Sequence, residues 1–118
     1  MKNFKDLIVW NKAIELVVSI YKATKEFSKE EQYGLTNQIR RAVVSIPSNI
    51  AEGHMRTTNK DFRQFLAIAR GSCAELETQI LIAYRLSYLN DAVYQDLNTK
   101  TEEIAKMLSS LSSKLIAR

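Results

Sequence analysis

Four basic side chains of this chain are spaced so that one helix face would carry them. Arg56, Arg63 and Arg70 recur at intervals of seven residues, which is nearly two helical turns, and Lys60 follows Arg56 by four. Phosphates of a nucleic-acid backbone release counterions when such cations neutralise them, and a guanidinium binds phosphate through two hydrogen bonds. The spacing therefore predicts phosphate binding. The alternative is a solvated helix face, or ion pairs to neighbouring helices or subunits.

The net charge of the chain is concentrated around these residues. The 118 residues carry a formal charge of +4. Residues 36–74 contain six basic and two acidic side chains, an excess of four positive charges, whereas the other residues contain eleven of each sign. The six basic residues are Arg40, Arg41, Arg56, Lys60, Arg63 and Arg70. A local positive field of this kind favours an anionic partner.

A second polar set runs through the central segment at helical spacing. Its members are Gln38, Arg41, Ser45, Asn49 and Glu52. A plain surface helix more often uses lysine and glutamate, which are better helix formers than serine or asparagine. The set therefore predicts a packed polar contact, either inside the protein or between subunits. The carboxylates considered as partners of Arg41 are Glu52, Glu75 and Glu77.

Pro47 lies in the middle of the same segment. Proline in a helix interior removes a backbone donor and costs roughly 3 kcal/mol. A local rule broken inside a regular pattern often marks a site with a role beyond folding.

Signatures of catalysis and of metal or cofactor binding are absent from the sequence. His54 is the only histidine and Cys73 the only cysteine, so neither a histidine-rich metal site nor an internal disulfide is expected. We expect Cys73 to be a buried small residue rather than a nucleophile. No glycine-rich phosphate loop, nucleophile elbow or zinc-protease helix is present. We therefore expect no enzyme activity, no metal and no cofactor.

The sequence shows neither a membrane span nor a secretion signal. No apolar run approaches the roughly 18 residues that cross a bilayer, and residues 1–6 lack the apolar core of a signal peptide. We therefore expect a cytoplasmic protein without a membrane partner.

Four amphipathic helices are expected to position these residues. The first is predicted over residues 6–27, the second from a capping box at Ser28 to Gly53, the third from a capping box at Thr58, and the fourth from Asn90–Asp91. The predicted core residues are Leu7, Trp10, Ala13, Ile14, Val17, Ile20 and Tyr21 in the first helix, Leu35, Ile39, Ala42, Ile46 and Ile50 in the second, Phe62, Phe65, Ala69, Leu76, Ile80 and Ala83 in the third, and Val93, Leu97, Ile104, Leu108, Leu111 and Leu115 in the fourth.

The connections between these helices are short, and three glycines with one proline supply too few turn residues for a many-stranded β fold. Short connections favour antiparallel neighbours. The chain is therefore predicted to be all-α, an up-down-up-down antiparallel four-helix bundle, with a single domain over residues 1–118.

Four motifs of the chain resemble a bacterial protein family. They are Phe4-x-x-Leu7-x-x-Trp10-x-x-Ala13, Tyr33-Gly34-Leu35-Thr36-x-Gln38-Ile39-Arg40-Arg41-Ala42, Ser45-Ile46-Pro47-x-Asn49-Ile50-Ala51-Glu52-Gly53 and Ala69-x-Gly71-Ser72-x-x-Glu75-Leu76-Glu77-Thr78. They resemble the four-helix-bundle proteins encoded in intervening sequences of large-subunit (23S) ribosomal RNA genes. The chain is similar too to the accessory variability determinant of diversity-generating retroelements.

The resemblance implies a left-handed bundle assembled as a homopentamer. In the retroelement relatives the pentamer is a basic barrel that binds nucleic acid and a reverse transcriptase, so a reverse transcriptase or another protein is an implied partner. The implied nucleic-acid contacts are Arg40, Arg41, Arg56, Lys60, Arg63 and Arg70. The implied structural motif residues are Ser45, Pro47, Asn49, Glu52, Gly53 and Glu75.

Charge and resemblance together predict a non-catalytic, homo-oligomeric accessory protein that binds RNA or DNA through backbone contacts. The alternative is a protein-interaction scaffold whose arginines serve subunit or partner interfaces.

Overall fold

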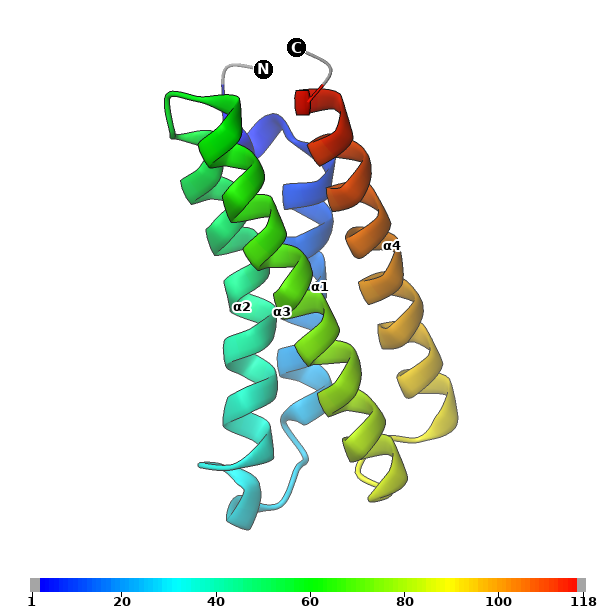
Figure 1. Ribbon diagram of the computed structural model, residues 1–118. Coiled ribbons are helices and arrows are strands. Elements are labelled where there is room, and N and C mark those ends of the chain that lie inside the picture. The colour runs from blue at the N-terminus through cyan, green and yellow to red at the C-terminus, as the bar shows by residue number, and fades with distance from the viewer. Residues whose placement is uncertain (1–2, 117–118) are drawn as a thin grey trace.

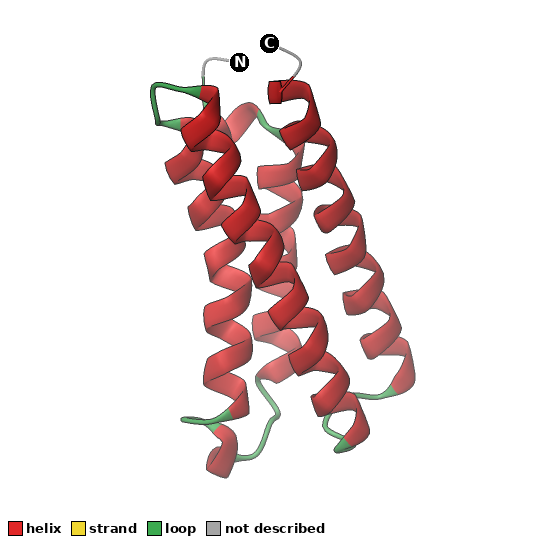
Figure 2. Cartoon of the chain, viewed as in Figure 1, coloured by secondary structure: helices red, strands yellow, loops and turns green. Residues whose placement is uncertain are grey.

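The computed structural model describes residues 3–116, and in that range it contains helices and connections but no strand (Figure 1; Figure 2). Its four long helices are α1 (Ile8–Thr24), α2 (Leu35–His54), α3 (Asn59–Arg85) and α4 (Asp91–Ile116). Two short 3₁₀ helices, η1 (Phe4–Asp6) and η2 (Lys29–Glu31), precede α1 and α2. The predicted all-α class is confirmed.

The four long helices run alternately up and down an elongated bundle of 46 × 24 × 20 Å. Each helix packs on the next one along the chain, and α4 closes the bundle against α1 (Figure 1). This is the predicted up-down-up-down arrangement. We call the end with the α2–α3 connection (residues 55–58) the upper end, and the end with the α3–α4 connection (residues 86–90) the lower end.

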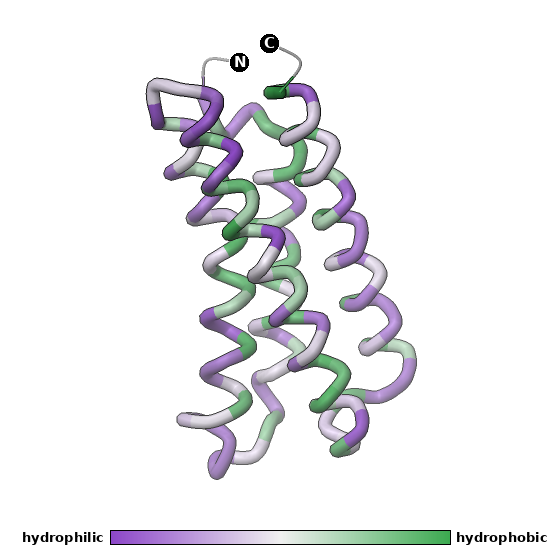
Figure 3. The backbone as a smooth tube through the Cα atoms, in the orientation of Figure 1, coloured by the Kyte–Doolittle hydropathy of each residue, from purple (hydrophilic) through white to green (hydrophobic). Residues whose placement is uncertain are grey.

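The core runs along the bundle axis between the four helices. Figure 3 shows apolar and polar stretches alternating along them, as amphipathic helices require. Ile46 of α2, Leu76 of α3 and Leu108 of α4 are all completely buried, as their spacing predicts. Each such side chain contributes roughly 1.5–3 kcal/mol through burial. The cores of α2, α3 and α4 therefore follow the predicted apolar positions, with the outermost ones only partly buried. Phe65 is the exception, because it was predicted in the core but is only partly buried and does not belong to the core, whereas its neighbour Leu66 is buried.

Helix α1 is rotated relative to the prediction. Ile14 and Tyr21, which were expected in the core, are 36% and 41% exposed, whereas Val9 and Leu16 are buried instead. The cause lies in the composition of α1, which carries apolar residues on more than one face. Periodicity alone therefore does not decide which face of α1 meets the other helices.

The second helix also begins later than predicted. Ser28 makes no capping hydrogen bond, and the residues after it form only the 3₁₀ helix η2. Helix α2 starts at Leu35, whose backbone N–H donates to Oε1 of Glu31 at 3.3 Å. The predicted starts of α3 and α4 are confirmed, since the Thr58 hydroxyl accepts from Asp61 N at 3.1 Å and the Asn90 side chain accepts from Val93 N at 2.8 Å.

Gly53 and Pro47 both lie inside α2 and are buried. The helix ends at His54, one residue after the end predicted at Gly53. A Cβ at this position would lie 2.6 Å from the Cβ of Phe65 and 3.0 Å from Cδ1 of Phe62, so the glycine allows α3 to approach α2 closely. At Pro47 the helix continues without a break, and the buried ring adds to the core.

Candidate nucleic-acid interface

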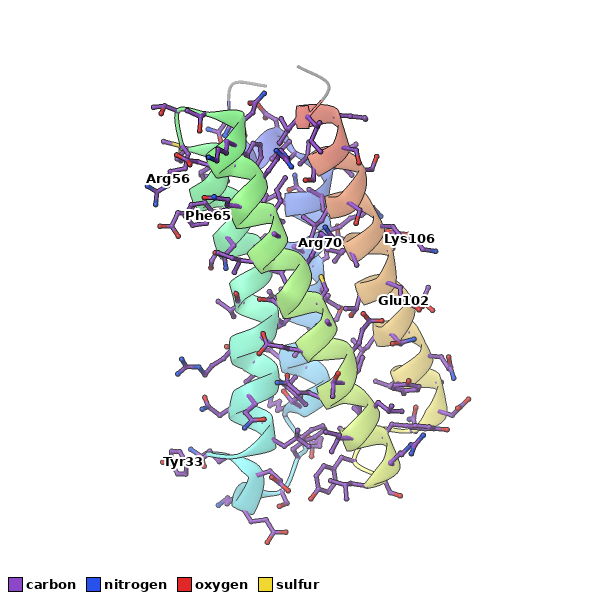
Figure 4. All side chains as sticks on the ribbon, viewed as in Figure 1. Tyr33, Arg56, Phe65, Arg70, Glu102 and Lys106 are labelled. Carbon is purple, nitrogen blue, oxygen red and sulfur yellow. The ribbon has the colours of Figure 1, made fainter. Side chains whose placement is uncertain are left out.

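The predicted stripe of four cations does not form on one helix. Arg56 lies in the α2–α3 connection, before α3 begins, so the seven-residue spacing does not place it above Arg63 and Arg70 on a helix face. Its guanidinium lies 3.4 Å from a carboxylate oxygen of Glu52 and 4.8 Å from the ring centroid of Phe65. Figure 4 shows Arg56 at the outer side of α2 and α3, away from α4.

Arg40 joins α2 to α1. Its Nε donates to the Thr24 hydroxyl at 3.0 Å, and its guanidinium lies 4.5 Å from the ring centroid of Tyr21. A second donor of Arg40 reaches the Tyr21 carbonyl at 3.4 Å. Much of the Arg40 side chain is therefore used in packing α2 against α1.

The other cations of α3 belong to the side that faces α4. Arg70 lines a groove between α3 and α4 that has a volume of about 660 Å³, and Lys106 of α4 lines the same groove (Figure 4). Arg63 lies seven residues before Arg70 on nearly the same face of α3, and Lys60 lies in the first turn of that helix. The structure thus brings Lys60, Arg63 and Arg70 to one side and adds Lys106 to them.

Most of these cations have no ionic partner. The ion pairs formed within residues 3–116 are Lys12–Glu103, Arg56–Glu52 and Lys100–Asp96. Lys60, Arg63, Arg70 and Lys106 are in none of them, and the buried Nε of Arg63 has no hydrogen-bond partner in that range. Unpaired cations beside a groove are suited to binding anions.

The floor of the α3–α4 groove consists of small residues. These are Ala67, Gly71 and Ala74 from α3 and Ala105 and Ser109 from α4. A Cβ at Gly71 would meet no atom within 4 Å, so packing within the chain does not require a glycine there. The backbone of α3 is therefore accessible at the level of the groove.

The polar set of α2 is divided between the interior and a second recess. The hydroxyls of Ser45 and Ser72 lie 2.8 Å apart, and the Asn49 amide donates to the Ser45 hydroxyl at 2.9 Å and to its carbonyl at 2.8 Å. These bonds link α2 to α3 and confirm a packed polar contact inside the bundle. The network satisfies polar groups that would otherwise be costly to bury.

Arg41 faces the second recess, which lies between α2 and α3 and has a volume of about 460 Å³. Glu75, Gln38 and Gln79 also line it. None of the considered partners of Arg41 forms an ion pair with it in the described part of the chain, and Glu52 pairs with Arg56 instead. The buried Oε1 of Gln79 has no hydrogen-bond partner there either. The recess therefore presents a cation, a carboxylate and a free acceptor side by side.

Two ionisable groups near the groove have raised pKa values. Burial raises the pKa of the Cys73 thiol to about 12, with a further increase from Glu77 and an opposing effect of Arg70. The thiol is therefore protonated at neutral pH and is not a nucleophile, as predicted for a buried cysteine. Burial also raises the pKa of Glu77, and the negative charge of Glu102 adds to that increase.

Among residues 3–116, no group of three or more histidine, cysteine, aspartate or glutamate side chains is arranged to hold a metal ion. The same residues contain no helix long and apolar enough to cross a membrane.

Sequence reasoning did not single out Lys106 or Gly71 as groove residues. They acquire this position because α4 packs beside α3 in one particular register. Periodicity along a single helix contains no signal for that register.

The family of the chain follows from a match along most of its length. A model of the 23S rRNA-intervening sequence protein family matches residues 5–110. The chain belongs to this family. The resemblance of the four motifs to proteins encoded in ribosomal intervening sequences is thereby confirmed.

A solved structure is similar to this 23S rRNA-intervening sequence protein over nearly its whole length. It is the 1.70 Å crystal structure of a protein with unknown function from the S23 ribosomal protein family of Bacteroides thetaiotaomicron VPI-5482. The two are 29% identical with a TM-score of 0.80, and the similar region covers 89% of this chain and 98% of that one. A search of curated proteins finds no match. The function of this family member must therefore be argued from its own surface.

Proposed function

We propose that this protein is a non-catalytic, homo-oligomeric accessory protein that binds a nucleic-acid backbone in its α3–α4 groove. The observation that carries the proposal is the position of Arg70 and Lys106. They come from adjacent helices, line one groove, and form no ion pair within residues 3–116. A phosphate chain in the groove meets a cation from each helix, and each neutralised phosphate releases counterions.

Gly71 supports the same groove. Glycine inside a helix costs about 1 kcal/mol relative to alanine, and no neighbouring atom of this chain requires it. Glycine is useful where a ligand approaches the backbone closely. A groove floor without a side chain at Gly71 lets phosphates approach α3.

Only some of the predicted contact residues lie beside the groove. Lys60, Arg63 and Arg70 lie on α3 toward the groove, and Lys106 is added from α4. Arg40 and Arg56 are engaged with aromatic rings and polar groups of their own chain. Arg41 faces the recess between α2 and α3.

That recess supports the homo-oligomeric part of the proposal. Arg41 and Glu75 line it without forming an ion pair within the described residues, and the acceptor of Gln79 has no partner there. A second copy of the chain could supply the missing donors and charges. Repetition of the groove in an oligomer raises affinity through avidity. The homopentamer and the reverse transcriptase partner rest on the resemblance to retroelement proteins and stay predictions.

The same recess favours a second candidate function, a protein-interaction scaffold. In that case Arg41 and the groove cations serve contacts between subunits or with an acidic protein. Substitution of the groove cations would then change the mass of the oligomer and leave the affinity for nucleic acid unchanged.

The test compares two double variants that each remove two positive charges. Arg70→Ala/Lys106→Ala removes the cations of the groove, whereas Lys12→Ala/Lys100→Ala removes lysines that are ion-paired elsewhere. We expect the groove variant to bind single-stranded RNA or DNA roughly tenfold more weakly, with a salt slope smaller by about 1.4, and the control variant to bind like the wild type.

Equal affinities of the two double variants would contradict binding in the groove. A groove variant that loses its oligomeric mass but keeps its affinity for nucleic acid would support the scaffold instead.

A further inference from the structure

The charge of the α3–α4 groove changes sign along its length. Glu77 lines the groove seven residues after Arg70 on α3, which is about 10 Å nearer the lower end. On α4, Glu102 precedes Lys106 by four residues, and Figure 4 shows it below Lys106 on the same helix. The cations therefore lie toward the upper end of the groove and the carboxylates toward the lower end.

Within residues 3–116, neither of these two carboxylates is in direct contact with a cation. Neither Glu77 nor Glu102 belongs to an ion pair within residues 3–116, and Glu102 accepts only a 3.5 Å hydrogen bond from the neutral Asn98 amide. The two lie close enough for the charge of Glu102 to raise the pKa of Glu77, a smaller effect than that of burial. Glu77 thus lines the lower part of the groove, and the charge of Glu102 acts on it from nearby on α4.

We infer that Glu77 and Glu102 form a charge boundary, which confines a bound nucleic-acid strand to the upper part of the groove. This inference rests on the proposed function. A carboxylate about 10 Å from a phosphate in water weakens binding by about a factor of two. Glu77 on the wall of the groove, with Glu102 close to it, repels any phosphate that passes below Arg70 and Lys106.

The boundary sets the length of strand that one protomer holds. From Lys60 to Arg70 the helix spans ten residues, or about 15 Å. At the 3.4 Å rise per nucleotide of a stacked strand, this distance takes roughly four nucleotides. A longer strand leaves the groove at the upper end, over the α2–α3 connection, instead of continuing toward the lower end.

The test compares Glu77→Gln/Glu102→Gln with Glu26→Gln/Glu30→Gln. Both double variants remove two negative charges, but Glu26 and Glu30 lie in the α1–α2 connection and η2, outside the groove. Fluorescence anisotropy measures binding of single-stranded oligonucleotides of four and twelve nucleotides at about 0.01 M salt, where the Debye length is about 30 Å and charges about 10 Å apart are only weakly screened. Circular dichroism verifies that all variants are folded.

We expect Glu77→Gln/Glu102→Gln to bind the longer oligonucleotide about threefold more tightly than the wild type does at this low salt. Binding of the shorter one, and binding of both by the control variant, should stay within twofold of the wild type. Equal affinities of the two double variants for the longer strand would overturn the boundary and leave the proposed function intact. A wild-type protein that binds neither strand would contradict both.

Discussion

Gly53 and Gly71 both place a residue without a side chain inside a long helix. At Gly53 the reason is internal, because a Cβ would lie 2.6 Å from the Cβ of Phe65 on α3. At Gly71 no atom of the part of the chain that the structure describes lies within 4 Å of the Cβ position. One glycine therefore serves the fold, and the other is free to serve a contact outside the chain.

Alanine at these two positions is expected to act in opposite directions. Gly53→Ala should destabilise the protein by about 1–3 kcal/mol, because α2 and α3 must move apart. Gly71→Ala should stabilise it by up to about 1 kcal/mol through helix propensity. Urea unfolding followed by circular dichroism measures both changes.

The two substitutions control for each other, since each adds one methyl group to a long helix. An unfolding free energy of Gly53→Ala equal to that of the wild type would show that the close approach of α3 to α2 is not required. In Gly71→Ala, affinity for nucleic acid gives a second readout. A loss of affinity in a more stable protein would support backbone contact in the groove.

At the scale of elements, helix starts are determined by specific hydrogen bonds rather than by residue type alone. Ser28 and Thr58 both begin sequences that fit a capping box, yet only Thr58 accepts a hydrogen bond from the third residue after it. Residues after Ser28 form one 3₁₀ turn, and α2 begins seven residues later at Leu35. The start of α3, close to Lys60, therefore depends on the Thr58 cap, whereas the start of α2 does not depend on Ser28.

Replacement of the two hydroxyl residues by alanine should separate these roles. Thr58→Ala is expected to cost about 1 kcal/mol, because it removes the acceptor for the Asp61 N–H. Ser28→Ala, the matched control, is expected to change stability by less than about 0.5 kcal/mol. Thermal unfolding compares the two, and equal losses would contradict a specific role for the Thr58 cap.

The features that sequence reasoning captured are those encoded within one helix. The apolar spacing of Ile39, Ile46 and Ile50 predicts the buried face of α2, and these residues are buried. The face of α1 was predicted wrongly, because Ile14 and Leu16 are equally apolar and only contact with α2 and α4 decides between them. The apolar spacing within one helix does not show which neighbouring helix each face will contact.

The candidate site shows the same division. Spacing of seven correctly puts Arg63 and Arg70 on one face of α3, but it also included Arg56, which lies outside the helix. Lys106 joins the groove only through the packing of α4 against α3. A site shared by two helices therefore depends on a register that no single stretch of sequence contains.

At the scale of the whole molecule, two neighbouring sides of α3 have different chemistry. The side toward α4 carries the groove, whose cations form no ion pair among the described residues 3–116 and whose lower part is lined by Glu77. The side toward α2 carries the recess with Arg41, Glu75 and the free acceptor of Gln79. In the function that we propose, the recess side contacts another subunit and the groove side binds nucleic acid.

The central claim is that an oligomer of this protein binds a nucleic-acid backbone through the α3–α4 groove. The most direct measurement is the affinity of the wild-type protein for single-stranded RNA and DNA across a salt series, with molecular mass measured in the same buffers. Four groove-side cations predict a slope of log affinity against log salt of about −3 per protomer for a single strand. An intact oligomer that binds no nucleic acid even at low salt would contradict the account.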